Sequence, residues 1–366
     1  MNKIAIIGLG NIGKLVPYFL QKNKYHDLTV FDIDKNKIKD SLALCNSAKQ
    51  IKTDLQNNYY DLVFLCLNPS QTVEFIKNNH RYLFNLEKIF ISITRIDYSN
   101  IDKYNEFDKY LKIHNIKLIV GCGLEPGLTE VLSQYLVNNN KDCDTLKIYC
   151  GGLPLKSKAP FYYSLLFGDK LPFVKRKAFY KENNQLIETK RFESLEKVFI
   201  DNFGQVEAFY DGMLPFFNID NIKNIYQKTI RWSGYARAIK ILDECGLFSD
   251  KKLEKYDISP NEFTHQTLLE NNILNKAKDM VLLNIILYKN NEPIENFKLK
   301  IKSENNISAM AIATIIPAVF TLNEILTGLN VKDGVNWMFE IYNNLSTNRL
   351  LNKLEENNFK LEYLDV

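Results

Sequence analysis

Near its start the chain carries the sequence Ile4-Ala5-Ile6-Ile7-Gly8-Leu9-Gly10-Asn11-Ile12-Gly13. Four apolar residues followed by the pattern glycine-x-glycine-x-x-glycine predict a buried strand, a tight turn and an amphipathic helix. In such a turn Gly8 permits the bend, Gly10 lets the backbone approach a pyrophosphate, and Gly13 lets the helix pack on the strand. The helix N-terminus favours phosphate groups through its unpaired N–H groups and partial positive charge. We therefore expect residues Gly8, Gly10, Asn11, Ile12 and Gly13 to bind a dinucleotide.

A carboxylate follows the second expected strand, which covers residues 28–31 and ends in Asp32, about 20 residues beyond the last glycine. A carboxylate at this position accepts hydrogen bonds from an adenosine ribose and repels a 2′-phosphate. NAD is therefore the expected cofactor in preference to NADP, although Asp34 and Lys35 beside it weaken that preference. The alternative interpretation is a glycine turn that only joins a strand to a helix.

Alternating apolar runs and amphipathic stretches continue through the first third of the chain. Further strands are expected over 62–67, 89–93 and 117–122, and helices around 37–44, 73–76 and 101–111. Strands without polar alternation, separated by helices, indicate a Rossmann-type doubly wound parallel sheet of the α/β class. Ligands lie beyond the carboxyl ends of such strands. We expect Asn68, Pro69 and Thr94 to contribute to the cofactor site, with residues 121–125 on the same rim.

The pattern changes after about residue 145. Strand-like pieces occur at 146–150, 178–180, 198–200 and 206–210, paired strands at 280–287 and 297–301, and helices at 235–244 and 309–326. These elements predict an inserted α+β domain with a mainly antiparallel sheet. The expected division is a dinucleotide-binding domain over 1–135, completed by about 310–366, and a domain for substrate binding and dimerisation over 136–309.

Composition bounds the class of protein. The chain has 366 residues, 46% of them hydrophobic, and a formal net charge of +4, which suits two domains and argues against a nucleic-acid partner. We expect no apolar run of the ~18–20 residues that a membrane span needs, and no signal peptide before the first strand. The six cysteines show no Cys-x-x-Cys spacing, which is typical of reduced proteins. The expected location is the cytoplasm.

Metal and nucleophile signatures are missing from the sequence. The four histidines, His26, His80, His114 and His265, fall in polar stretches. They are expected at the surface, and no metal is expected because none joins a set with metal-ligand spacing. No Gly-x-Ser-x-Gly pattern indicates nucleophilic catalysis by a serine.

Five stretches of the sequence form a recognisable combination. The first is Gly121-Cys122-Gly123-Leu124-Glu125-Pro126-Gly127-Leu128-Thr129, at the end of an expected strand. The others are Gly151-Gly152-Leu153-Pro154, residues 204–212, Thr229-Ile230-Arg231-Trp232-Ser233-Gly234-Tyr235, and Ser308-Ala309-Met310-Ala311 with Thr314. Together they resemble the saccharopine dehydrogenase-like family, which includes saccharopine reductase, lysine 6-dehydrogenase and carboxynorspermidine-type enzymes. The resemblance spans roughly residues 1–335.

The resemblance implies a nicotinamide-dependent oxidoreductase that acts at a carbon–nitrogen bond of an amino acid or polyamine conjugate. Together with the apolar content of the second domain it also suggests a homodimer. The chain departs from the family pattern around the expected pocket, for example at Ser92-Ile93-Thr94-Arg95 and at Ile312. These departures motivate an alternative, a dinucleotide-binding sensor or scaffold that has lost its catalytic activity.

Four side chains are the candidate catalytic and substrate-binding residues. Arg231 is the expected anchor for a substrate carboxylate, which a guanidinium grips through two parallel hydrogen bonds; its alternative is a structural ion pair. Glu125 is expected either to bind an ammonium group or assist proton transfer, or to cap the helix starting at Pro126. Cys122 either lines the pocket as a thiol of ordinary pKa or packs in the rim. Tyr163, with Tyr162, either closes the substrate site or belongs to the core.

Overall fold

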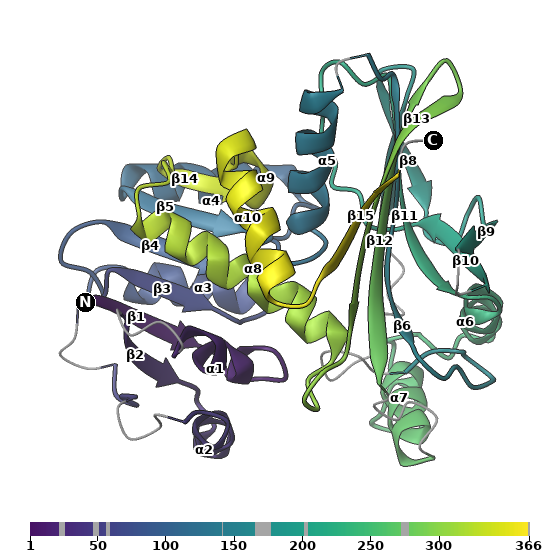
Figure 1. Ribbon diagram of the computed structural model, residues 1–366. Coiled ribbons are helices and arrows are strands. Elements are labelled where there is room, and N and C mark those ends of the chain that lie inside the picture. Colours follow the sequence, from purple (N-terminus) through teal and green to yellow (C-terminus); the bar gives the residue numbers. More distant parts are fainter. Residues whose placement is uncertain are drawn as a thin grey trace. The chain divides into compact units, whose positions relative to one another are not determined.

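The structure, a computed structural model, describes residues 1–21, 26–46, 51–55, 59–140, 142–164, 177–200, 204–271 and 278–364. Its contacts divide the chain into two compact units. Unit 1 comprises Met1–Tyr135 and Ala313–Asn357, and unit 2 comprises Leu136–Ile312 and Asn358–Val366 (Figure 1). The end of the chain differs from the expected division, because residues from 358 onward belong to unit 2 and not to the dinucleotide-binding domain.

Unit 1 is built on a six-stranded parallel sheet, which confirms the Rossmann-type fold expected from the buried apolar runs. Its strands are β1 (Asn2–Ile7), β2 (His26–Phe31), β3 (Leu62–Leu65), β4 (Lys88–Ser92), β5 (Ile116–Val120) and β14 (Gly334–Trp337). They are ordered β14-β5-β4-β3-β1-β2. The chain runs from β1 to β2 on one side and continues at β3 on the other, so the strand order reverses beside β1. Ligands of open α/β sheets bind at such a reversal.

Helices connect the strands of unit 1. They include α2 (Lys35–Ala43), α3 (Pro69–Asn79), α4 (Ile101–Ile113), α9 (Met338–Ile341) and α10 (Asn344–Glu356). The helix expected after the glycine turn is short: a 3₁₀ turn η1 (Gly13–Leu15) runs into α1 (Val16–Leu20). Pro17 lies in the first turn of α1, where its missing N–H costs no helical hydrogen bond. α5 (Leu128–Asn139) begins in unit 1, and α8 (Ala309–Leu326) ends there.

Unit 2 contains a nine-stranded sheet, and the expected antiparallel character is confirmed for most strand pairs. Its strands are β6 (Thr145–Pro154), β7 (Lys177–Glu182), β8 (Gln185–Lys190), β9 (Glu196–Ile200), β10 (Gly204–Tyr210), β11 (Asn224–Trp232), β12 (Asp279–Lys289), β13 (Glu292–Lys302) and β15 (Lys360–Leu364). The order is β15-β13-β12-β6-β11-β10-β9, with β7 paired to β11 and β8. Only the β6–β11 pair is parallel among these described strands. Helices α6 (Tyr235–Glu244) and α7 (Pro260–Glu270) complete the unit.

The core of this sheet is formed by alternate residues of neighbouring strands. One buried cluster contains Leu153, Val206, Ala208, Ile230, Met280 and Leu282. Side chains on alternate strand positions share one face, and the register pairs Val206 with Trp232 and Ala208 with Ile230. The opposite face of β10 and β11 therefore carries the intervening residues, among them Glu207 and Arg231.

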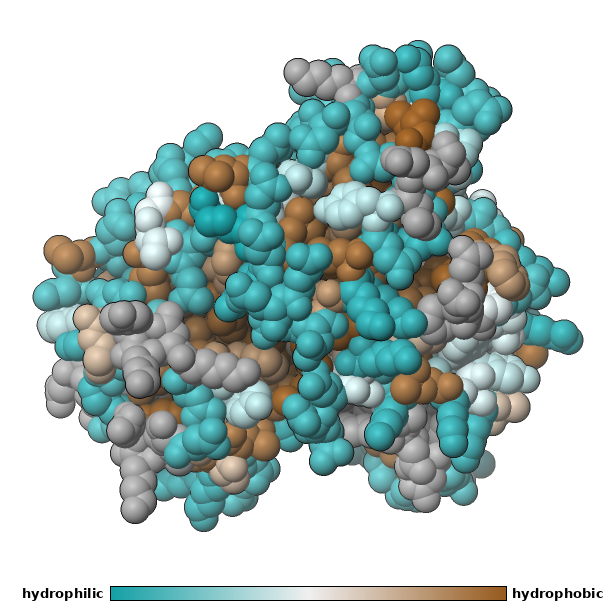
Figure 2. Space-filling view, in the orientation of Figure 1, coloured by the Kyte–Doolittle hydropathy of each residue, from teal (hydrophilic) through white to brown (hydrophobic). Residues whose placement is uncertain are grey.

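Two expectations from composition are wrong. Helix α8 is long and apolar enough to cross a membrane by length and composition, yet 72% of that stretch is buried inside the protein. Such a helix is weak evidence for a membrane span, since a buried core helix can be equally long and apolar. On the face shown in Figure 2, hydrophilic residues predominate and hydrophobic ones form separate patches.

The histidines also differ from the expectation. His80 was expected at the surface, but it is buried, and the other three histidines are half-buried.

Candidate functional site

The glycine turn after β1 is shaped by close contacts with the end of β3. A Cβ atom on Gly8 would lie 2.7 Å from the Cys66 carbonyl oxygen, and one on Gly13 would lie 1.9 Å from the Gly8 carbonyl oxygen. Gly8 also has φ +88°, a backbone conformation that glycine adopts without strain. Only glycine fits at both positions, which explains the first and last glycines of the pattern.

The middle glycine is different, because its surroundings are open. A Cβ atom on Gly10 would meet no atom within 4 Å. Gly10 therefore does not serve packing, and the space beside its backbone is what a pyrophosphate requires. The Gly10 carbonyl accepts a hydrogen bond from the Lys14 N–H at 3.1 Å, which starts the helical turn. These residues fit a dinucleotide phosphate group.

Asp32 lies at the carboxyl end of β2 and is fixed to the glycine turn. Its Oδ2 accepts the Leu9 N–H at 2.7 Å, and its Oδ1 accepts the Asp34 N–H at 2.9 Å. An ionised carboxylate offers about four acceptor positions, so the two oxygens retain capacity for ribose hydroxyls. Asp34 caps α2 through the Asn36 N–H.

The three other expected cofactor residues have structural roles in unit 1. Asn68 caps α3 by accepting the Gln71 N–H at 2.9 Å, and Pro69 occupies the first turn of that helix. Thr94 Oγ1 donates to the Leu67 carbonyl at 3.0 Å, which ties the end of β4 to the segment after β3. The structure thus brings Thr94 to the carboxyl edge of the sheet. The cofactor contacts of all three residues stay predictions.

Cys122 lies at the same carboxyl edge of the sheet as Thr94, since its N–H donates to the Ser92 carbonyl at 3.1 Å. The side chain is fully buried, and burial raises the pKa of the Cys122 thiol above its usual range. A thiol of ordinary pKa at this position, as one interpretation of the sequence had it, is therefore wrong. The packed alternative fits the burial.

The cap of helix α5 also differs from the expectation for Glu125. The helix begins at Leu128, two residues later than predicted, and the Gly127 N–H donates to Glu130 Oε2 at 2.6 Å. Glu130 is fully buried, whereas Glu125 is half-buried. A carboxylate three residues after the capped N–H is a known sequence signature, so Glu130 was open to prediction and was missed.

Arg231 is the central charged residue of unit 2. It lies on β11, and its side chain is buried, with the residue 6% exposed. Its Nη1 donates to the Ile230 carbonyl at 2.8 Å, and its Cζ lies 5.2 Å from the Tyr163 ring centre and 5.9 Å from that of Tyr235. Nε is buried and has no hydrogen-bond partner in the part of the chain that the structure describes. Among the described residues, no carboxylate lies within 4.0 Å of this guanidinium.

The acidic residue opposite Arg231 binds backbone N–H groups and not the arginine. Glu207 on β10 is the register partner of Arg231. Its carboxylate instead accepts the Gly234 N–H at 2.9 Å and the Ala236 N–H at 2.5 Å, at the start of α6. A carboxylate at a helix N-terminus is stabilised by the helix dipole. Glu207 therefore leaves the Arg231 guanidinium without a counter-ion among the described residues. Sequence analysis missed the role of Glu207.

A second buried arginine shows the contrasting arrangement. Arg191 Nη2 lies 2.9 Å from Asp211 Oδ2, and both side chains are almost fully buried. Arg191 also packs on Phe192, with its Cζ 4.8 Å from the ring centre. A structural ion pair was the alternative interpretation of Arg231 from the sequence, and in the structure Arg191 forms such a pair.

Tyr163, whose ring faces Arg231, is followed in the chain by Ser164. Both are buried, and burial raises the pKa of Tyr163 to about 12, while the Arg231 charge acts in the opposite direction. Tyr163 therefore keeps its proton at neutral pH and is a hydrogen-bond donor, not a base. The Ser164 Oγ is buried without a hydrogen-bond partner. Tyr162 packs near Gly234. No group of three or more metal-binding side chains occurs among the described residues.

The family model of the saccharopine dehydrogenase C-terminal domain matches residues 123–359. The chain belongs to the saccharopine dehydrogenase family. A second family model, the NAD binding domain of 6-phosphogluconate dehydrogenase, matches residues 3–127, which includes the glycine turn and Asp32. The protein is thus an NAD-binding oxidoreductase of the saccharopine dehydrogenase family, and its cofactor is a nicotinamide dinucleotide.

One solved structure shows the same fold. Apo saccharopine dehydrogenase (L-Glu forming) from Saccharomyces cerevisiae is 14% identical to this member of the family, with a TM-score of 0.71 over 100% of both chains. Scyllo-inositol dehydrogenase from Lactobacillus casei, with bound NAD(H) and scyllo-inositol, is 11% identical over 99% of each chain with a TM-score of 0.46.

Proposed function

We propose that this protein transfers a hydride at a carbon–nitrogen bond of an amino acid or amino-acid conjugate, as lysine 6-dehydrogenase or saccharopine reductase do. The observation that carries the proposal is the Arg231 guanidinium, which is buried without a carboxylate partner among the described residues. Arg191 in the same unit has such a partner.

An uncompensated buried charge is costly, and proteins keep one only where something else balances it. A substrate carboxylate balances a guanidinium well, because two parallel N–H donors match its two oxygens. The orphaned Nε of Arg231 is one such donor. The main-chain carboxylate of an amino acid is therefore the proposed partner of Arg231.

Tyr163 and Ser164 are the proposed hydrogen-bonding partners of the substrate beside the Arg231 anchor. Tyr163 supports the guanidinium with its ring, and its protonated hydroxyl is a donor toward substrate oxygen or nitrogen. Ser164 offers a buried hydroxyl that no described group satisfies. We assign both as substrate contacts, and Glu125 as the group that binds an ammonium or moves a proton.

The residues of unit 1 hold the cofactor in this proposal. Gly10 leaves room for the pyrophosphate, and Asp32 accepts the ribose hydroxyls, so NAD is preferred to NADP. A bound nicotinamide dinucleotide supplies the hydride acceptor or donor. Oxidation requires a deprotonated substrate amine, so the oxidative rate rises with pH, and the product imine then hydrolyses or cyclises.

The test is a turnover screen with the purified full-length protein, in parallel with cofactor binding. Lysine, ornithine, saccharopine and polyamines are offered with NAD or NADP at high pH, and amine–aldehyde pairs with the reduced cofactors. Turnover with a carboxylated amine is the expected result. Binding of the cofactor without turnover in either direction would favour the inactive sensor or scaffold instead.

A further inference from the structure

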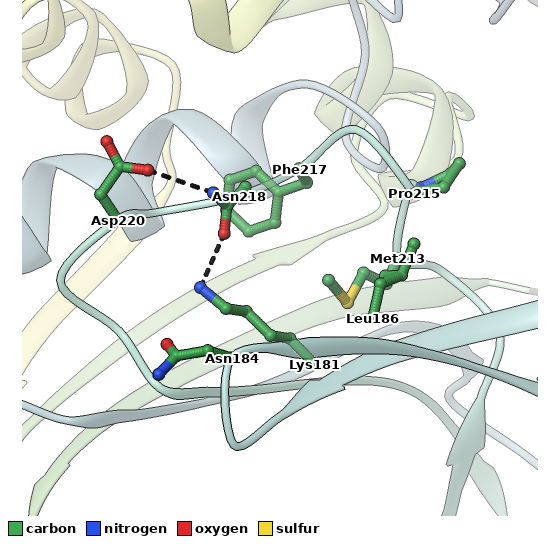
Figure 3. A pocket seen from close by; sticks show the side chains of 8 residues that line it. All are labelled: Lys181, Asn184, Leu186, Met213, Pro215, Phe217, Asn218 and Asp220. Carbon is green, nitrogen blue, oxygen red and sulfur yellow. Dashed lines mark hydrogen bonds between the residues drawn. The ribbon is translucent and has the colours of Figure 1, made fainter.

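Unit 2 contains a cavity that includes none of the residues assigned above. Its volume is about 360 Å³, which lies within the range of small-molecule sites. It lies between the β7–β8 hairpin and the loop that joins β10 to β11 (Figure 3). The lining residues are Lys181, Asn184, Leu186, Met213, Pro215, Phe217, Asn218 and Asp220.

A lysine with an unusual environment lies in this cavity. Lys181 on β7 is only 7% exposed. Its Nζ donates to Asn218 Oδ1 at 2.7 Å and to the Ile219 carbonyl at 3.3 Å. Both acceptors are neutral, and no carboxylate of the described residues lies within 4.0 Å of this ammonium group. Figure 3 shows Lys181 pointing toward Asn218, which in turn donates to Asp220.

Lys181 thus has no direct counter-ion among the described residues. A buried ammonium without a counter-ion is unfavourable, and burial accordingly lowers the pKa of Lys181, with Asp220 acting in the opposite direction. An ammonium has three donors, and the two hydrogen bonds above use two of them. A ligand carboxylate would accept the third and supply the missing negative charge.

The remaining lining residues define the rest of the ligand. Met213 and Phe217 are buried and apolar, and Leu186 is a partly exposed apolar residue. Asp220 is exposed and carries a negative charge that pairs with no described lysine or arginine within 4.0 Å. The cavity thus offers one cation, one anion and an apolar wall.

We propose that this cavity binds an α-amino acid with an apolar side chain. Its carboxylate binds Lys181, its ammonium group binds Asp220, and its side chain packs on Met213, Phe217 and Leu186. Arg231 is not among the residues that line this cavity, so the proposed ligand is distinct from the substrate carboxylate assigned to Arg231. This inference does not depend on which substrate the enzyme uses.

Calorimetric titration of the protein tests whether the ligand needs its carboxylate, its ammonium group and its apolar side chain. L-Leucine and L-methionine are the probes, with 4-methylpentanoate lacking the amine, 3-methylbutylamine lacking the carboxylate, and L-glutamate lacking the apolar side chain. Binding of L-leucine is expected, at least tenfold tighter than that of any of the three control compounds. The proposal is overturned if L-leucine does not bind at millimolar concentration, or if either truncated analogue binds as tightly as L-leucine.

Three variants test whether L-leucine binds in this cavity. Lys181→Met keeps the length and apolar stem of the side chain and is expected to weaken L-leucine binding at least tenfold. Asp220→Asn, at an exposed position, is expected to weaken it about fivefold. The matched control is Lys177→Met, an exposed lysine on the same strand that pairs with Glu188 at 2.9 Å.

Arg231→Ala separates this site from the proposed substrate site, since it should leave L-leucine affinity unchanged. Should Lys181→Met bind L-leucine as tightly as the natural protein, or Arg231→Ala abolish the binding, the cavity is not the site. Both results leave the proposed dehydrogenase activity untouched, because that activity is measured separately.

Discussion

The Cζ atom of Arg231 lies 5.2 Å from the centre of the Tyr163 ring, so the buried charge rests on an aromatic face. Such contacts contribute about 0.5–2 kcal/mol. Tyr163→Phe keeps the ring but removes the hydroxyl proposed to donate to the substrate, a hydrogen bond that contributes about 0.5–1.5 kcal/mol, so we expect the Kd for a carboxylated substrate to rise roughly threefold. Tyr163→Leu removes the ring and should weaken that Kd roughly fivefold to tenfold. Equal effects of the two variants on the Kd would show that the hydroxyl, and not the ring, supports the site.

Two of the three glycines of the turn, Gly10 and Gly13, allow cofactor binding to be tested separately from stability. Gly10→Ala should fold with an unchanged melting temperature, because its Cβ atom meets nothing within 4 Å, and should weaken NAD binding at least tenfold. Gly13→Ala should lower the free energy of unfolding by about 1–3 kcal/mol, because its Cβ atom would clash with the Gly8 carbonyl. Thermal unfolding and NAD titration of both variants check this. A Gly10→Ala protein that binds NAD normally would contradict the pyrophosphate position.

Asp32 should determine the choice between the two cofactors. Asp32→Asn keeps an acceptor for the Leu9 N–H but removes the charge that repels a 2′-phosphate, so the ratio of NADP to NAD affinity should rise roughly tenfold or more. Asp34→Asn is the matched control, since Asp34 caps α2. An unchanged ratio in Asp32→Asn would remove Asp32 from the cofactor site.

His80 should make the protein less stable in mild acid. The side chain is 1% exposed and its Nε2 lies 3.0 Å from the Tyr110 hydroxyl. Burial, with smaller effects from the charges of Lys88, His114 and Arg81, lowers the pKa of His80 from 6.5 to about 4. Below pH 6.5 His80 is protonated in the unfolded chain, whereas in the folded chain it stays neutral down to about pH 4. The free energy of unfolding therefore falls as the pH falls through this window.

The size of this effect follows from linkage. Between pH 7 and pH 5 the His80 contribution to the free energy of unfolding should fall by about 2 kcal/mol. His80→Gln should lose this part of the pH dependence in urea unfolding at the two pH values. His265→Gln, at a half-buried histidine on α7, should retain it. Identical pH dependence in both variants would contradict the assignment.

The parallel sheet of unit 1 was predictable because its strands are continuous apolar runs, which leave few alternatives. Strand β14 was not, since Gly334–Trp337 has four residues and pairs with β5, which is far away in sequence. Helices α6 and α8 were predicted with their observed bounds, because apolar periodicity and a following glycine mark them.

The site was only partly predictable. Arg231 followed from a resemblance to a family, but its missing counter-ion depends on Glu207, whose carboxylate turns to α6. Cross-strand partners and their competing hydrogen bonds are set by tertiary structure. Lys181 illustrates the same limit, because among 47 lysines and arginines only the fold shows which of the described ones are buried without a direct counter-ion.

The most direct test of the account compares lysine with its decarboxylated diamine, cadaverine, in the natural protein and in Arg231→Ala. If the screen identifies another amine, that substrate and its decarboxylated form replace this pair. The natural protein should prefer the carboxylated amine in kcat/KM by roughly 10- to 100-fold, and Arg231→Ala should lose this preference while NAD affinity stays the same. Arg237→Ala, at an exposed arginine on α6, is the matched control and should keep the preference. A variant without Arg231 that still discriminates between the two amines would contradict the central claim.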